Sequence, residues 1–193
     1  MAEPQHDFLR DLRETQALLE GHFLLTSGRH SSRFLLLSRL VAQPARLRPW
    51  LEVLAEFGGP LDPTHVLGPA MGGVILAWAV AERMPGRPAA LFAEKLPEGG
   101  LGIRRGFQLT SANRVLVVED ALTTGGSVMQ AARAAEARGA RIVGVGTLVD
   151  RRPEDVRLPY PTLGVLRLLA PAWEEADCPL CADHEPLVRP KDL

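Results

Sequence analysis

Val115–Ser127, with the sequence VLVVEDALTTGGS, is the stretch that decides the fold. It opens with four consecutive apolar residues, as expected of a parallel strand buried on both faces, and the acids Glu119 and Asp120 follow directly. Thr123–Ser127 contains only small residues, and a helical pattern covers Ser127–Arg138. The stretch therefore predicts a strand that ends in two acids, a tight glycine turn and a helix.

The predicted turn has the features of a phosphate site. Ligands of open α/β sheets bind beyond the carboxyl ends of the strands, where helix N-termini present free amides. Thr123, Thr124 and Ser127 add hydroxyl donors, and Ser127 is also expected to cap the helix. Neither the Walker A lysine nor the dinucleotide-binding glycine spacing is present, which favours a monophosphate. Glu119 and Asp120 would accept hydrogen bonds from two ribose hydroxyls. The alternative is a surface turn whose glycines only permit close packing.

On both sides of this stretch, predicted strands alternate with predicted helices, as in a parallel sheet with crossover helices. Further strands are expected at Val66–Leu67, Ala89–Phe92 and Arg141–Val149, and further helices at Pro4–Gly21, Pro44–Phe57 and Val74–Met84. Two short strands, Phe23–Leu25 and Phe34–Leu37, would flank a polar turn. We expect N-terminal helices and a hood hairpin over residues 1–60, an α/β core over 61–170 and a tail over 171–193.

Composition narrows the class of protein. The chain has 193 residues, of which 46% are hydrophobic and 23% charged, enough for a substantial core. A formal net charge of -1 argues against a dedicated nucleic-acid binder. No apolar run approaches the roughly 18 residues that cross a bilayer, so we expect a cytoplasmic protein without membrane contact.

Cys178 and Cys181 are the only cysteines, in a Cys-x-x-Cys within the tail. They are too few for the disulfide framework of a small secreted domain and fit a reducing compartment. With His184 they would supply part of a zinc site, but a fourth ligand is not evident nearby. The alternative is a tail turn that carries free thiols.

Val117–Ser127 closely resembles the phosphoribosyl pyrophosphate signature of type I phosphoribosyltransferases. Segments that resemble the orotate-specific branch of this family lie between residues 15 and 152: Gly21–Arg29 with Ser31 and Phe34, Gly68–Val74, Phe92–Lys95, Arg104–Phe107, and Asp150 with Arg151. The Cys-x-x-Cys tail is similar to one branch of the same family. The resemblance implies an α/β fold, a parallel sheet flanked by helices, with a small N-terminal hood.

The resemblance also implies roles for individual residues. Ala70–Gly73 would face pyrophosphate, Glu119 and Asp120 would hold the ribose hydroxyls, and the turn would cradle the 5′-phosphate. Arg151 would pair with the orotate carboxylate, which a planar guanidinium suits. The residues expected to bind phosphoribosyl pyrophosphate are Ala70, Met71, Gly72, Gly73, Lys95, Glu119, Asp120, Ala121, Leu122, Thr123, Thr124, Gly125, Gly126 and Ser127. Those expected to bind orotate are Thr26, Phe34, Thr123 and Arg151.

The chain lacks several of the lysines that members of the family usually have. Thr26 stands where members often have lysine, the turn Met71–Gly73 lacks the usual lysine, and the long mobile loop is replaced by Glu94–Arg104. Lys95, Arg104 and Arg105 are the available cations, and with Asp120 they are the expected catalytic residues. Each cation could equally be a solvated charge at a strand end. Gly99, Gly100 and Gly102 would let the loop move as a lid.

The implied reaction transfers ribose 5-phosphate from phosphoribosyl pyrophosphate to orotate, giving orotidine 5′-monophosphate and pyrophosphate in pyrimidine biosynthesis. The resemblance implies a need for Mg²⁺ and a homodimer. The alternatives are a purine or uracil phosphoribosyltransferase, or a non-catalytic regulatory nucleotide sensor of the same fold.

Overall fold

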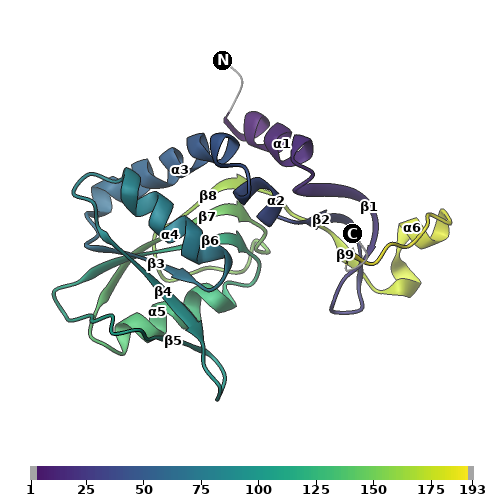
Figure 1. Ribbon diagram of the computed structural model, residues 1–193. Coiled ribbons are helices and arrows are strands. Elements are labelled where there is room, and N and C mark those ends of the chain that lie inside the picture. The colour runs from purple at the N-terminus through teal and green to yellow at the C-terminus, as the bar shows by residue number, and fades with distance from the viewer. Residues whose placement is uncertain (1–3, 191–193) are drawn as a thin grey trace. The chain divides into compact units, whose positions relative to one another are not determined.

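The computed structural model describes residues 4–190, which form two compact units (Figure 1). The core unit comprises Leu47–Arg167. The hairpin unit combines the segment that ends at Arg46 with the segment that begins at Leu168. The C-terminal tail thus shares a unit with the N-terminal segment, whereas the sequence led us to expect three successive segments with boundaries near residues 60 and 170.

The core unit is built on a six-stranded sheet in the order β5-β4-β3-β6-β7-β8. All neighbouring strands are parallel except β4 and β5, which form an antiparallel hairpin. The strands are β3 (His65–Pro69), β4 (Ala89–Lys95), β5 (Leu101–Ile103), β6 (Arg114–Leu122), β7 (Arg141–Asp150) and β8 (Thr162–Arg167). The predicted parallel sheet is confirmed, and β8, where no strand was expected, continues the sheet beyond β7.

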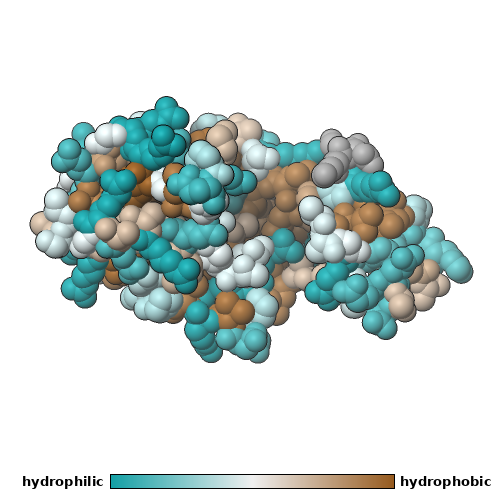
Figure 2. All heavy atoms as spheres, turned by 90° about the horizontal axis from the view of Figure 1, so that it is seen from below, coloured by the Kyte–Doolittle hydropathy of each residue, from teal (hydrophilic) through white to brown (hydrophobic). Residues whose placement is uncertain are grey.

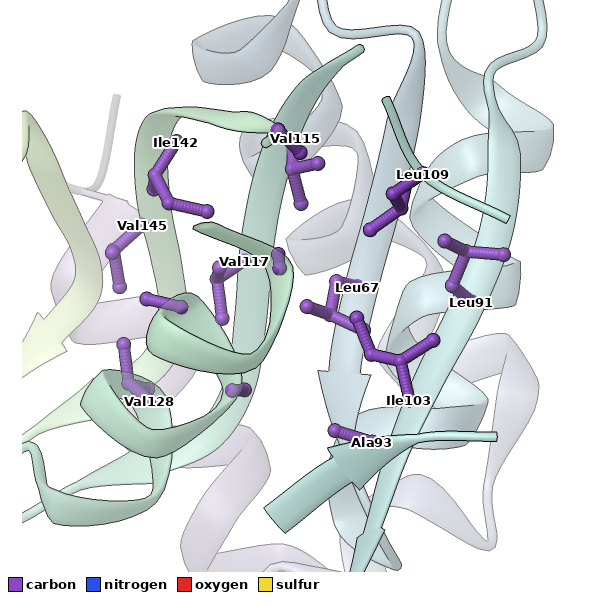
Figure 3. Packing of buried hydrophobic residues seen from close by; sticks show 14 of the residues in the cluster. Leu67, Leu91, Ala93, Ile103, Leu109, Val115, Val117, Val128, Ile142 and Val145 are labelled. Carbon is purple, nitrogen blue, oxygen red and sulfur yellow. The ribbon is translucent and has the colours of Figure 1, made fainter. Parts of the chain in front are cut away.

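Helices cover both faces of this sheet, as predicted. α3 (Pro44–Gly58) and α4 (Gly72–Arg83) lie on one face and α5 (Gly126–Glu136) on the other (Figure 1). Alternate residues of β6 serve the two faces: Val115 and Val117 belong to the layer under α5, shown in Figure 3. A short 3-10 turn, η1 (Gly59–Leu61), follows α3.

Two local expectations around the phosphate turn were wrong. β6 does not end before the acids but continues to Leu122, with Glu119 opposite Thr147 of β7. Its other neighbour, β3, pairs with it only as far as Val117, so the acids lie where one edge of β6 is open. α5 begins at Gly126 rather than Ser127, with Gly125 as its N-cap residue at φ 82°, and no described side chain caps it. Ser127 therefore lies inside the helix.

The hairpin unit contains a three-stranded antiparallel sheet in the order β1-β2-β9. Its strands are β1 (Leu18–Leu24), β2 (His30–Leu35) and β9 (Ala172–Trp173); its helices are α1 (Pro4–Glu14), α2 (Ser38–Val41) and α6 (Pro179–Ala182), with the 3-10 turn η2 (Glu175–Asp177). The expected hairpin is present, but the first helix ends at Glu14 rather than Gly21 because Leu18–Leu24 pairs with β2. The tail flanks the hairpin on both sides, since β9 pairs with β2 and Val188 bridges to Phe23.

Apolar side chains also reach the surface. On the face shown in Figure 2, apolar patches lie among hydrophilic residues. Among the residues that the structure describes, the large apolar ones with the greatest exposure are Met71 (85%), Trp78 (65%) and Ile75 (54%), all in α4 or the turn before it. Within residues 4–190, no helix combines the length and apolar character needed to span a membrane.

Candidate active site

The acids of β6 differ in their surroundings. Glu119 is only 8% exposed, and this burial, followed by the neighbouring charge of Asp120, raises its pKa to about 8. Asp120 is half-buried, and its Oδ1 accepts a hydrogen bond of 2.7 Å from the amide of Ala121. Thr147 donates its hydroxyl to the backbone oxygen of Asp120 at 3.2 Å. The pair thus presents one buried carboxyl group, whose pKa is raised, beside a more accessible one.

The turn after β6 encloses a hollow of about 230 Å³. The first helical hydrogen bond of α5 runs from the amide of Met129 to the oxygen of Gly125, so the preceding amides have no acceptor within the helix. Thr123, Thr124 and Ser127 are exposed beside these amides, whereas the side chain of Leu122 is buried. The arrangement provides hydroxyl and amide donors for an anion. The hollow is lined by Glu119, Ala121, Leu122, Thr123, Thr124, Gly125, Gly126, Ser127, Val128 and Gln130.

The turn between β3 and α4 lies close to the acids of β6. A Cβ atom on Gly72 would lie 2.5 Å from Oδ2 of Asp120, and one on Gly73 would lie 2.9 Å from the oxygen of Val118. The Ala70–Met71 peptide bond is cis, and the amide of Ala70 donates to the oxygen of Ala93 at 2.7 Å. Glycine at positions 72 and 73 therefore lets backbone amides approach the acids closely.

A second hollow of about 310 Å³ joins the predicted elements within the core unit. It is bounded by Ala70 of the turn before α4, by Glu119 of β6, by Ser127 of α5 and by Lys95 of β4. Gln130 borders both this hollow and the hollow at the turn after β6, and our sequence reasoning missed it. The available signal was helical spacing, because Gln130 lies three residues after Ser127 on the same helix face.

The β4–β5 hairpin separates the three candidate cations. Arg105 makes two hydrogen bonds to Glu94, of 3.3 and 3.1 Å, and Arg104 lies 3.9 Å from the same carboxylate. The hydrogen bond from Arg105 lowers the pKa of Glu94. Both arginines border a separate hollow with Glu94, whereas Lys95 also borders the hollow that contains Glu119. Among these three cations, Lys95 alone borders the hollow that contains Glu119.

The stretch expected to be a lid is an ordered hairpin. The amide of Leu96 donates to the oxygen of Gly100 at 3.1 Å, and Gly99 and Gly100 have φ values of 97° and 78°. These positive values suit glycine, so the glycines have a structural role in the turn. Gly102 lies in β5 opposite Glu94. Closure of this hairpin over a substrate stays a prediction.

The two arginines after β7 have different partners. Arg152 is buried and donates two hydrogen bonds, of 3.0 and 2.8 Å, to the carboxylate of Asp150. Arg151 is half-buried, and its Nε is a buried atom without a hydrogen-bond partner among residues 4–190. Burial lowers the pKa of Arg151. A buried donor without a partner is costly, so Arg151 is ready to bind an acceptor such as a carboxylate.

The remaining predicted base contacts belong to the hairpin unit. Thr26 and Phe34 border one hollow of about 310 Å³, together with Leu24, Leu25, Arg189 and Pro190. Arg189 was missed because nothing in the sequence shows that the tail returns to the hairpin, where the amide of Val188 donates to the oxygen of His22 at 2.8 Å. Contact of Thr26 and Phe34 with a base stays a prediction.

Comparisons with known proteins agree with this geometry. Residues 52–165 match the family model for the phosphoribosyl transferase domain. A curated relative from Thermus thermophilus, named orotate phosphoribosyltransferase, is 44% identical over 181 residues, which cover 94% of this chain and 98% of the relative. The matched domain is that of the family whose signature Val117–Ser127 resembles.

Solved structures of the same family share the fold. Orotate phosphoribosyltransferase from Aeropyrum pernix aligns with a TM-score of 0.71 at 27% identity, covering 82% of this chain and 92% of that one. The enzyme from Mycobacterium tuberculosis H37Rv, solved in complex with inorganic phosphate, aligns with a TM-score of 0.67 at 28% identity, covering 84% and 96%. The chain therefore belongs to the orotate phosphoribosyltransferase family.

Proposed function

We propose that this chain is a pentosyltransferase that moves ribose 5-phosphate from phosphoribosyl pyrophosphate to orotate. The products are orotidine 5′-monophosphate and pyrophosphate, a step of pyrimidine biosynthesis. The observation that carries the proposal is the single hollow bordered by Ala70, Lys95, Glu119 and Ser127, which brings together the groups expected for each part of the sugar substrate. The 44% identity to a named orotate phosphoribosyltransferase supports the same conclusion.

Each part of the sugar substrate has a matching group in the core unit. The free amides of α5 and the hydroxyls of Thr123, Thr124 and Ser127 suit the 5′-phosphate. Glu119 and Asp120 suit the ribose hydroxyls as hydrogen-bond partners. The glycine turn before α4 and the ammonium of Lys95 suit the pyrophosphate, which gains negative charge as it leaves.

Orotate is assigned through Arg151. Its carboxylate would receive hydrogen bonds from the guanidinium, whose Nε lacks a described partner. Uracil and purines lack this carboxylate, so Arg151 favours orotate over the alternative bases. The ring nitrogen of orotate is already acidic, and the transfer therefore needs no strong general base. Exclusion of water from the closed site would protect the activated sugar from hydrolysis.

We also propose that the reaction requires Mg²⁺. The carboxylate oxygens of Asp120, beside the turn at Gly72, are of the type that Mg²⁺ prefers. When bound with the diphosphate, the ion supplies electrostatic stabilisation to the leaving group. A homodimer and a cytoplasmic location belong to the same proposal; the exposed apolar residues of α4 support the dimer.

The decisive experiment is a base-specificity assay. Purified protein is mixed with phosphoribosyl pyrophosphate and Mg²⁺, with orotate, uracil, hypoxanthine or adenine in separate reactions, and loss of each base is followed. We expect turnover of orotate that stops when the metal is chelated. Absence of orotate turnover in the presence of Mg²⁺ would refute the proposed function, and turnover of another base instead would assign the chain to a different branch.

A further inference from the structure

We propose that the hairpin unit binds one structural zinc ion through His22, His30, Cys178 and Cys181. One ligand atom from each of these side chains lies within 4.8 Å of all the others. Nε2 of His22 lies 2.9 Å from Nδ1 of His30, 3.5 Å from Sγ of Cys178 and 3.6 Å from Sγ of Cys181. Sγ of Cys181 lies 3.2 Å from Nδ1 of His30.

These separations are close to those of a tetrahedral zinc site. With Zn–S bonds of about 2.3 Å and Zn–N bonds of about 2.05 Å, tetrahedral geometry puts sulfur and nitrogen ligands about 3.6 Å apart and two nitrogens about 3.3 Å apart. The observed sulfur–nitrogen distances are 3.5, 3.6 and 3.2 Å, and the nitrogen–nitrogen distance is 2.9 Å. A small outward shift of the His30 ring would complete the tetrahedron.

Hydrogen bonding alone does not account for the convergence on His22. Its Nδ1 lies 2.9 Å from the backbone oxygen of Glu185, to which an Nδ1–H would donate. That tautomer leaves a single lone pair on Nε2, yet His30, Cys178 and Cys181 all approach this one atom. A cation at their centre would satisfy all four ligand atoms together. The contact to Glu185 is also the outer hydrogen bond that commonly orients a metal-binding histidine.

The donor set selects the metal and its role. Two thiolates and two imidazoles are typical of tetrahedral zinc, whereas Mg²⁺ and Ca²⁺ prefer oxygen ligands. His22, His30 and Cys178 are each only 3% exposed. With four protein ligands and little access for solvent, the site has no open position for a substrate, so the ion would stabilise structure rather than catalyse a reaction.

The C-terminal tail is attached to the hairpin by polar contacts and strand pairing but has almost no apolar core. Within residues 169–190, Cys178 is the only buried residue, so the tail contributes almost nothing to an apolar core. The zinc site would join α6 to β1 and β2 across 156 residues of sequence. It would thereby fix the segment between β9 and Val188, the two places where the tail pairs with the hairpin. Metal binding would substitute for the missing core.

The sequence identified the cysteines but not their partners. His184, the nearby histidine, is exposed and lies outside the cluster. The missing ligands are His22 and His30, which only the folded hairpin brings to the tail. His184 therefore supplies a matched control, because it is a histidine of the same tail that should not affect metal binding.

The test is the metal content of the full-length chain, purified under reducing conditions without a metal-affinity tag. Elemental analysis should find about one zinc ion per chain in the wild type and in His184→Ala. Cys181→Ser and His22→Gln should each reduce this content about tenfold or more. Less than about 0.1 zinc per wild-type chain, together with no uptake when Zn²⁺ is added to the reduced protein, would overturn the proposal.

A spectroscopic measurement keeps the proposal testable if a variant fails to fold. Zn²⁺ is removed from the wild-type chain by a chelator and replaced by Co²⁺, which has visible absorption bands that report its geometry. We expect intense tetrahedral bands and a sulfur-to-cobalt charge-transfer band, both unchanged in His184→Ala. An octahedral spectrum without the charge-transfer band would contradict the ligand set. None of these readouts depends on turnover of orotate.

Discussion

Among single residues, Glu119 makes the stability of the core unit depend on pH. Its folded-state pKa of about 8 exceeds the ordinary value of about 4.3 for a glutamate. Between these values the folded chain holds a proton that the unfolded chain has lost, so the free energy of unfolding decreases as pH rises through this window. Glu119→Gln removes the titration. The free energy of unfolding of the variant, taken relative to that of the wild type, should therefore increase as pH rises from 5 to 8. The increase should be on the order of 1 to 3 kcal/mol.

Thermal or urea unfolding at pH 5, 6.5 and 8 measures this effect as the difference in the free energy of unfolding between the variant and the wild type. Glu154→Gln is the control, because Glu154 is an exposed glutamate and its replacement should leave the difference constant. A difference for Glu119→Gln that stays the same at all three pH values would contradict the raised pKa.

Arg151 is predicted to determine recognition of orotate. Loss of a charge-assisted hydrogen-bonded pair costs about 1.5–3 kcal/mol, so Arg151→Ala should lower kcat/KM for orotate by roughly 10- to 150-fold. Half-saturation by phosphoribosyl pyrophosphate should change little, because its predicted contacts lie on other elements. Steady-state kinetics with each substrate varied in turn separate the two effects. Arg157→Ala, at an exposed arginine of the same loop, is the control, and unchanged orotate kinetics in Arg151→Ala would remove its assigned role.

Among the secondary-structure elements, the sequence predicts those whose pattern is local. Val115–Val118 indicates a buried strand, and the small residues after it indicate a turn, because both signals lie within one short stretch. The sequence does not show that β6 includes Glu119 and Asp120, because that extension depends on pairing with β7. Leu19 fits a helical stripe equally well, and only pairing with Phe34 of β2 makes it part of a strand. Tertiary contacts decide such cases.

The β4–β5 hairpin gives a prediction about its cations. Lys95 borders the hollow of the acid pair, whereas Arg105 is hydrogen-bonded to Glu94. If Lys95 stabilises the leaving pyrophosphate, Lys95→Ala should lower kcat by about a hundredfold or more, as removal of one transition-state donor typically does. Arg105→Ala should lower it by less than about tenfold, since an exposed ion pair contributes little. Turnover numbers at saturating substrates make the comparison, and equal losses in both variants would contradict the assignment.

The turn before α4 predicts an intolerance to side chains at one glycine. An added Cβ at Gly72 would lie 2.5 Å from Oδ2 of Asp120, so Gly72→Ala should displace either the turn or the carboxylate. We expect phosphoribosyl pyrophosphate to bind at least about tenfold more weakly, a loss of roughly 1.4 kcal/mol. Gly59→Ala is the matched control, because a Cβ at Gly59 meets nothing within 4 Å. Calorimetric titration of both variants tests this, and equal affinities would contradict the predicted clash.

On the scale of the whole molecule, the two compact units differ in how far the sequence reveals them. The groups assigned to phosphoribosyl pyrophosphate all lie in the core unit, in the last residues of β4 and β6 or in the turns and helix starts that follow β3 and β6. The stretch Val115–Ser127 has a local signature in the sequence, so its part of the candidate site could be predicted, and the resemblance to the family supplied the other residues. The hairpin unit brings together segments more than 120 residues apart, from the N-terminal part up to Arg46 and the tail from Leu168. Pairing over that separation leaves no periodic signal, and the grouping of His22, His30, Cys178 and Cys181 was invisible for that reason.

The exposed apolar residues of α4 and of the turn before it predict a dimer interface. Met71, Ile75 and Trp78 are spaced by four and three residues, so they follow one face of the helix. Each is more than half exposed, and an exposed apolar patch of this kind commonly marks an interface between proteins. If a second copy of the chain covers this face, Trp78→Lys should convert a dimer into a monomer. Because Met71 belongs to the turn assigned to pyrophosphate, the monomer should also lose activity.

Light scattering coupled to size-exclusion chromatography measures the mass across a range of concentrations, and activity is assayed at the same concentrations. Leu187→Lys is the control, since Leu187 is an exposed apolar residue of the tail (44% exposed) and its replacement should leave a dimer intact. A wild-type chain that stays monomeric at all concentrations would exclude the dimer. A Trp78→Lys variant that stays dimeric would place the interface elsewhere, because a buried lysine without a partner opposes association across this face by several kcal/mol.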